Sequence, residues 1–406
     1  MSDLQIPSLL TPAAAQRTVF QQFQAGHGYE QAAGGTGTLS DDTTDFVIGT
    51  QSLKYVTKGD ENQNHIRKKS TGPYDFTASD LRIVFKVEGL AHLEQFSIFL
   101  SSDNLATTNV HYTIATPFQP YIADGEWASL TLSWGDLAGN FPAGSIKRSA
   151  VNYVELRIED DKVAPVTIHV NEISAVPEPT NGVVSIVFDD GWESTSTKAR
   201  SYMDKYGMRG TSCIIRDVVG EANYMSLAQL KSLQQISRWD ICAHANTVAN
   251  HNAGFGTLED SVVEEELEGI KGWLIENGFK RRDVFMWPKG SFTASQMPLA
   301  LEFFNAIRGT TGGKGGPGGA QETFPPGENG RLRSWLVGNT ATAAEVEAAL
   351  TQCSTNKSWL ILTFHRIVAS GASEGTECNE ATFKEMIDKV KSSGLAVKTV
   401  AEVLES

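Results

Sequence analysis

The sequence has few cysteines, no long apolar run and no excess of positive charge. Its four cysteines include no CxxC pair, so neither a disulfide framework nor a thiolate zinc site is expected. No apolar stretch reaches the roughly 18 residues of a membrane span, and the first residues lack the basic and apolar regions of a cleaved export signal. With 34 Lys and Arg against 48 Asp and Glu, the chain offers no general basic surface for phosphates. Nucleic acid is therefore not expected as a partner.

What the sequence does contain is ordinary globular composition over 406 residues, which is too long for one typical domain. Residues 31–175 consist of short runs in which apolar and polar residues alternate, separated by turn formers, and this pattern predicts a β-sandwich. Residues 1–30 fit no domain and are interpreted as an N-terminal arm or connector. Residues 176–182 combine two prolines with turn formers and are interpreted as a linker.

From residue 183 to 406 the pattern changes to apolar strands that alternate with amphipathic helices. Ser226 is the predicted N-cap of one helix, and a second helix is predicted to begin near Thr257. Such alternation indicates βα units around a parallel sheet or barrel. Residues 309–330 are rich in Gly and Pro and are predicted to form a long loop. The expected protein is multidomain, with a sandwich followed by a barrel.

Three predicted strands in this second half end in residues that can bind metals or transfer protons. The first ends in Asp189 and Asp190, the second in His244 with His251 seven residues later, and the third in His365. Taken singly, an Asp-Asp-Gly run is as often a turn as a site, and a lone histidine is more often packed than a ligand. Strand ends of a barrel meet at one face, however, and two imidazoles with a carboxylate form a set of ligands suited to zinc.

With these residues in place, the half from residue 183 onward resembles the polysaccharide deacetylase family, carbohydrate esterase family 4, whose fold is a distorted (β/α) barrel. Residues 186–191 match its first motif and residues 359–365 its last, and residues 225–244 look like the helix and strand before its second motif, ending in His244. The resemblance implies that Asp189 is the catalytic base and that Asp190 and His244 are metal ligands. It further implies that His365 is the general acid and that Leu362 lines the acetyl pocket.

Two of the motifs depart from the family pattern. The second ligand histidine normally follows the first by four residues, but position 248 is Val. Either a longer loop brings His251 to the metal, or the site has weaker or lost metal affinity. The third motif reads Met286-Trp287-Pro288-Lys289-Gly290, and Met stands where the family has an arginine that orients the base. Asp189 is then expected to pair with Lys289 or Arg366, or to act unpaired.

Two other residues of the third motif are candidates for substrate contact. The backbone N–H of Lys289 is expected to donate to the oxyanion. Trp287 either packs under a sugar or fills the mouth of the barrel. The acidic residue of the family's fourth motif, which tunes the general acid, has no match near residues 331–335.

The implied reaction is the metal-dependent removal of N- or O-acetyl groups from a polysaccharide, with Zn²⁺ as the expected cofactor. The first half is similar to jelly-roll carbohydrate-binding modules, and its aromatics Tyr74, Tyr112, Tyr121 and Trp127 are candidates for sugar stacking or for core packing. A glycan-directed enzyme without an export signal suggests, for instance, a phage virion component that acts on a bacterial surface glycan and is synthesised in the cytoplasm. A chain that has lost catalysis and serves as an adhesin or tail-structural protein, and an amidohydrolase acting on a non-sugar amide, remain alternatives. An oligomer is compatible with the sequence.

Overall fold

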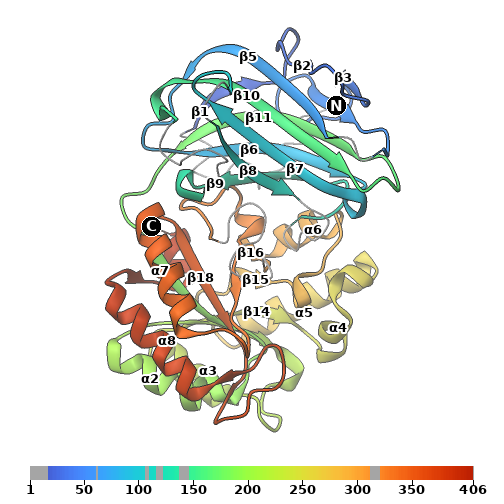
Figure 1. The fold of residues 1–406 in the computed structure, drawn as a ribbon. Helices are drawn as coiled ribbons and strands as arrows, with labels where there is room; N and C mark the ends of the chain where they lie inside the picture. The colour runs from blue at the N-terminus through green and yellow to red at the C-terminus, as the bar shows by residue number, and fades with distance from the viewer. Residues whose placement is uncertain are drawn as a thin grey trace. The chain divides into compact units, whose positions relative to one another are not determined.

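The computed structural model describes residues 17–60, 63–105, 109–115, 122–136, 146–310 and 321–405, and these form two compact units (Figure 1). Unit 1 holds the described residues up to Glu178 together with the short segment Pro325–Glu328. Unit 2 holds the remaining residues from Pro179 onward. The division falls inside the predicted linker 176–182. In the described ranges, no helix has both the length and the apolar character needed to cross a bilayer.

Unit 1 is built from two antiparallel sheets. The first has the strand order β3–β4–β11–β6–β9, and β1 pairs with the second half of β11. The second has the order β2–β5–β10–β7–β8. The strands of the first sheet are β1 (Thr18–Gln22), β3 (Thr38–Asp42), β4 (Ser52–Val56), β6 (Ser79–Glu88), β9 (Trp127–Leu132) and β11 (Thr167–Pro177). Those of the second are β2 (Glu30–Gln31), β5 (Asn64–Tyr74), β7 (Leu93–Ser101), β8 (Val110–Ala115) and β10 (Val151–Asp160).

Both sheets contribute side chains to one hydrophobic core. Every second residue of β6, beginning with Leu81 and Ile83, and every second residue of β10, beginning with Val154 and Leu156, belongs to the same buried cluster. The period of two in the sequence thus corresponds to one face of each strand that packs into the shared core. The assignment of this unit to the jelly-roll class stays a prediction.

The N-terminal residues differ from the predicted arm. Residues 1–16 lie outside the described part of the chain, but β1 pairs with β11, and Phe23 and Tyr29 are buried in the core of unit 1. The strand was missed because its polar residues, two of them glutamine, hide the alternation. Among the four candidate aromatics, Tyr112 is buried and donates from its hydroxyl to a backbone carbonyl. Tyr121 lies outside the described residues.

Unit 2 contains one eight-stranded sheet in which all pairs are parallel, in the order β16–β15–β14–β13–β12–β18–β17, with β21 beside β12. Its strands are β12 (Val183–Phe188), β13 (Thr211–Ile215), β14 (Asp240–Ala245), β15 (Val284–Met286), β16 (Ala306–Arg308), β17 (Trp335–Leu336), β18 (Trp359–Phe364) and β21 (Ala396–Val397); β19 (Ile367–Val368) and β20 (Cys378–Asn379) form a separate pair. The helices are α2 (Ser201–Met203), α3 (Leu227–Gln235), α4 (Val248–Ala253), α5 (Asp260–Glu276), α6 (Gln296–Phe303), α7 (Ala343–Asn356), α8 (Glu380–Ser393) and α9 (Val400–Leu404).

The two faces of the parallel sheet carry different clusters. Ile186 and Phe188 belong to the helix-side cluster, in which strand residues pack with helix residues such as Leu267. Val187 and Met286 belong to the inner cluster on the opposite face. A short segment connects the two edges of the sheet: Leu332 bridges to Arg308 on β16, and three residues later β17 pairs with β18. The strands therefore curve into a half-barrel, and the distorted (β/α) barrel of the sequence analysis stays a prediction.

One of the two predicted helix starts is confirmed, and the other lies a few residues further along the chain. Ser226 caps α3 with a capping box, in which its hydroxyl accepts from the Gln229 amide. The second helix, α5, begins at Asp260, because Thr257 lies in a preceding 3₁₀ turn. Helices α5 and α7 pack against β14 and β18, and α8 packs against α7 (Figure 1).

A buried acid in unit 1 makes its stability depend on pH. Burial raises the pKa of Asp80 on β6 to about 7, although the Trp134 amide donates to its carboxylate. The folded state thus holds a proton that the unfolded chain releases near pH 4, and stability falls as the pH rises from about 4 to about 7. We expect the free energy of unfolding of Asp80→Asn at pH 8 to exceed that of the wild type by up to about 4 kcal/mol, so that the variant unfolds at a higher urea concentration. At pH 4 the two proteins should be equally stable.

Urea titrations at the two pH values measure this difference. Asp75→Asn, which alters an exposed carboxylate, is the control and should show no such gain at pH 8. An Asp80→Asn variant no more stable than the wild type at pH 8 would contradict the prediction.

Candidate metal centre and active site

Strand β12 delivers two adjacent carboxylates to one end of the parallel sheet. Asp189 continues the alternation of Val187 toward the inner face and is only 3% exposed. Asp190 and Gly191 then have φ values of 70° and 80°, so two left-handed residues in succession turn the chain sharply. Aspartate is among the few residues that tolerate this conformation, and glycine adopts it freely. The turn lets Asp190 remain at the same end of the sheet as Asp189.

The carboxylate of Asp190 meets two imidazoles. Its Oδ1 lies 3.3 Å from Nε2 of His244 and 3.2 Å from Nε2 of His251, and the two Nε2 atoms are 3.1 Å apart. His244 is buried at the end of β14, and His251 is on α4. The structure thus brings together the three predicted metal ligands, including the histidine at the unusual spacing.

The loop that carries His251 is held by buried and charged groups. After β14, Thr247 caps α4, and this short helix returns His251 toward His244. The carboxylate of Glu266, which is buried on α5, accepts hydrogen bonds from the amides of Asn246 and Thr247 and from the Thr247 hydroxyl. This support leaves no distinct signal in the sequence, because Glu266 lies within a run of acidic helix residues.

The donor set fits a divalent cation. Nδ1 of His244 bonds to the Met286 carbonyl and must carry the proton there, so Nε2 presents its lone pair. Burial opposes ionisation of Asp190, but its contacts with His244 and His251 hold the pKa of its carboxyl well below the usual value. Ligands at about 2.0–2.1 Å from one ion in a tetrahedral arrangement lie about 3.3–3.4 Å apart, close to the separations of 3.1–3.3 Å found here. Two histidines and one carboxylate with open positions are typical of a catalytic zinc site.

The second oxygen of Asp190 is also held. The indole Nε1 of Trp192 donates to Oδ2 at 2.9 Å, and the ring of Trp192 stacks on Tyr224 with centroids 4.5 Å apart. Such outer hydrogen bonds fix the orientation of a ligating carboxylate. Trp192 directly follows the Asp-Asp-Gly run, and this position was the available signal for its role.

Asp189 pairs with a residue that the sequence analysis did not consider for it. The guanidinium of Arg308, on β16, donates to Oδ2 of Asp189, and Arg308 is 2% exposed. The predicted partners lie elsewhere: Lys289 donates to the Asn252 carbonyl, and Arg366 pairs with Glu377 at 3.3 Å. Both predictions for the partner of Asp189 were therefore wrong. The three-residue strand that carries Arg308 is too short to produce a clear sequence pattern.

His365 also lies at this end of the sheet. Its Nε2 is 3.9 Å from Oδ2 of Asp189. Burial lowers the pKa of His365 below the usual value, although the charges of Asp190 and Asp189 oppose this effect. Its Nδ1 is buried and has no hydrogen-bond partner among the described residues. The acidic residue expected to tune the general acid is thus not found in that part of the chain.

The remaining three candidates differ from expectation to varying degrees. Lys289 adopts a φ of 57° in the turn after β15, and its side chain bonds to α4 next to His251, so it ties two elements of the site together. A role for its backbone amide stays a prediction.

Trp287 is 3% exposed, and its indole stacks on the ring of Phe292, with centroids 5.1 Å apart. It is a packing residue and does not present a face to a sugar.

Leu362 belongs to the helix-side cluster, on the face of β18 opposite to the site. Alternation along the strand instead puts Thr363 on the face of His365. Thr363 is fully buried, and its hydroxyl has no hydrogen-bond partner among the described residues. The expectation that Leu362 lines an acetyl pocket therefore does not agree with the structure. The expectation came from the resemblance to the family's last motif and did not take the period of two along the strand into account.

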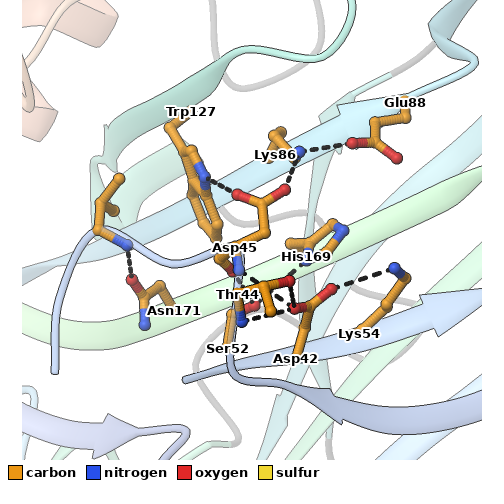
Figure 2. A network of polar contacts seen from close by, with 11 residues as sticks. Asp42, Thr44, Asp45, Ser52, Lys54, Lys86, Glu88, Trp127, His169 and Asn171 are labelled. Atoms are coloured by element: carbon orange, nitrogen blue, oxygen red, sulfur yellow. Dashed lines mark hydrogen bonds and ion pairs between the residues drawn. The ribbon is translucent and has the colours of Figure 1, made fainter. Parts of the chain in front are cut away.

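A second cluster of possible ligands lies in unit 1, where Asp45, Glu88 and His169 come together. Figure 2 shows that Lys86 lies between the two carboxylates and contacts both. Burial would lower the pKa of Lys86, but its bonds to Asp45 and Glu88 raise it, so the ammonium keeps its charge. Because a lysine already supplies the positive charge, we interpret this cluster as a structural network that holds the loop containing Asp45 against the sheet.

Comparison with known proteins finds one sequence family that matches this chain. Residues 177–302 match the sequence model of the polysaccharide deacetylase family. The chain contains a polysaccharide deacetylase domain. No curated protein sequence matches the chain.

Several solved structures are similar to part of the chain. One is the family 4 carbohydrate esterase domain of a multidomain xylanase from the hindgut metagenome of Trinervitermes trinervoides, with 12% identity, 56% of this chain and 91% of that chain covered, and a TM-score of 0.38. Another is a family 4 acetyl xylan esterase from Clostridium thermocellum in complex with cobalt, with 14% identity, coverage of 55% and 90%, and a TM-score of 0.37. A third is a pseudoenzyme of carbohydrate esterase family 4 from Bacillus anthracis, with 12% identity and a TM-score of 0.37; the match covers 56% of this chain and 67% of that chain.

The two clusters predict a definite metal stoichiometry. After removal of metals with a chelator and reloading with zinc, the wild type should bind one Zn²⁺ per chain. His251→Ala removes one of three ligands and should weaken zinc binding by about 100-fold or more. Glu88→Gln, in the cluster of Asp45, Glu88 and His169 that Lys86 already neutralises, should still bind one Zn²⁺ per chain. Elemental analysis and competition with a chromogenic chelator measure both quantities. Full zinc affinity in His251→Ala, or a second zinc that is lost in Glu88→Gln, would contradict the assignment.

Proposed function

We propose that the deacetylase domain is a metal-dependent enzyme that removes N- or O-acetyl groups from a polysaccharide, with Zn²⁺ as the cofactor. The observation that carries the proposal is the convergence of Asp190, His244 and His251 within 3.3 Å of one another, beside the buried Asp189. An ion pair network built only for stability would not need two imidazole nitrogens directed at one carboxylate oxygen. The match of residues 177–302 to the deacetylase family supports the same reaction class.

The residues around the ligand set divide the chemistry of hydrolysis between them. A divalent cation, when bound, acts as a Lewis acid and lowers the pKa of a coordinated water. Asp189 serves as the general base, because its Oδ1 is buried without a hydrogen-bond partner and can accept a proton. His365 donates a proton to the departing nitrogen or oxygen. The backbone amide of Lys289 stabilises the oxyanion.

The proposed substrate is an acetylated glycan, for instance a bacterial surface polysaccharide met by a phage virion. Unit 1 is proposed to be a jelly-roll module, and of its candidate aromatics Tyr74 and Trp127 are partly exposed. A protein that has lost catalysis and only binds glycans is the alternative, and it predicts neither metal nor product.

The decisive experiment combines metal analysis with a screen for acetate release over acetylated oligosaccharides and bacterial glycans. The proposal predicts about one zinc per chain and acetate formation that stops on chelation and returns with zinc. Asp190→Asn, which weakens the metal site, is the matched control. A zinc-loaded protein that releases no acetate from any N- or O-acetylated glycan would contradict the proposal.

The role of His365 can be tested separately. An amine leaves poorly unless it is protonated, so we expect His365→Ala to lower kcat on an N-acetyl sugar by roughly 100-fold or more, and to have a smaller effect on an O-acetyl ester. Steady-state acetate release on matched substrates measures both values. His92→Ala in unit 1 is the control. An unchanged rate on the N-acetyl substrate would remove His365 from the scheme.

A further inference from the structure

We infer that Arg308 is the positioning residue for Asp189, and that β16 supplies to the site a positive charge that β15 lacks at Met286. This inference rests on the proposed function, because it concerns the general base of that reaction. Arg308 is the one lysine or arginine that the described residues place in an ion pair with Asp189. Both partners are at most 3% exposed.

The guanidinium is fixed at every nitrogen. Its Nε lies 2.7 Å from Sδ of Met286, and its second terminal nitrogen donates to the Gly309 carbonyl at 3.1 Å and to the Ser334 hydroxyl at 2.8 Å. The Ser334 hydroxyl in turn donates to the Gly309 carbonyl at 2.9 Å. An arginine held at this many points cannot swing away from Asp189, so the position of the carboxylate is also fixed.

The contact assigns different tasks to the two oxygens of Asp189. Oδ2 accepts from Arg308, whereas Oδ1 has no hydrogen-bond partner among the described residues. A carboxylate bound at one oxygen by a fixed guanidinium keeps the lone pairs of its other oxygen in a constant direction. Arg308 therefore orients Oδ1 for proton transfer without touching the substrate.

Strand pairing explains how the charge can come from β16. Met286 and Arg308 are direct partners in the parallel pair β15–β16, and neighbouring strands lie about 4.8 Å apart. Both residues share the inward parity of Val284 and Ala306, which belong to the inner cluster. An arginine at either position thus begins on the same face of the sheet, one strand apart, and can direct its guanidinium to the same carboxylate.

This equivalence suggests an exchange experiment on the full-length, zinc-loaded protein. We expect Arg308→Met to lower kcat by about 100-fold or more with little change in KM, because misplacing the base impairs the transition state rather than binding. Arg308→Lys should recover only part of the loss, since an ammonium lacks the planar fork. The double variant Met286→Arg/Arg308→Met should recover at least about tenfold of the loss.

Two controls separate positioning from folding. Arg82→Met removes an equally buried, ion-paired arginine from unit 1 and should leave kcat unchanged. The zinc content of Arg308→Met should remain at one per chain, because the three ligands are untouched. If Arg308→Met does not fold, Arg308→Lys and the exchange variant provide the same comparison.

The outcomes distinguish the two proposals. Acetate release by the wild type together with full turnover in Arg308→Met, or with no recovery in a folded exchange variant, would overturn the role of Arg308 alone. Absence of acetate release by the zinc-loaded wild type would overturn the proposed function, and the role of Arg308 with it.

Discussion

The site depends on how two neighbouring carboxylates are kept ionised in a buried place. Like charges this close raise one another's pKa unless positive groups separate them, and burial adds to the effect. In this chain Asp189 faces a buried arginine, whereas Asp190 faces two imidazoles arranged for a cation. The pKa of each carboxyl is accordingly lowered despite burial. Each carboxylate thus has its own counter-charge, and the two can take different parts in one reaction.

Much of this arrangement could be predicted from the sequence, because strand ends and histidines follow simple local rules. Apolar runs between helical segments identified β12, β14 and β18, and the residues just beyond them are Asp189, Asp190, His244 and His365. The period of two along a strand then predicts which side chains share a face. The same rule, applied to position along β18, would have favoured Thr363 over Leu362 as the residue beside His365. The position of residues at strand ends therefore carried the correct part of the prediction, and the period of two would have corrected the assignment of Leu362.

Other features depend on contacts between residues far apart in the chain, which no local pattern reveals. Arg308 lies 119 residues from Asp189, and its three-residue strand carries little signal of its own. Glu266 supports the metal loop from a helix whose acidic residues look alike in sequence. In unit 1, Lys86 closes a cluster that composition alone would allow to bind a cation. In each case the decisive fact is which side chain fills a given space.

The short helix α4 has a consequence for how this site can vary. Because His251 is presented by a helical turn that starts at the Thr247 cap, each inserted or deleted residue would rotate its imidazole by about 100° around the helix axis. Loop lengths between the two histidines are therefore restricted to a few discrete values that return the ring to the same side.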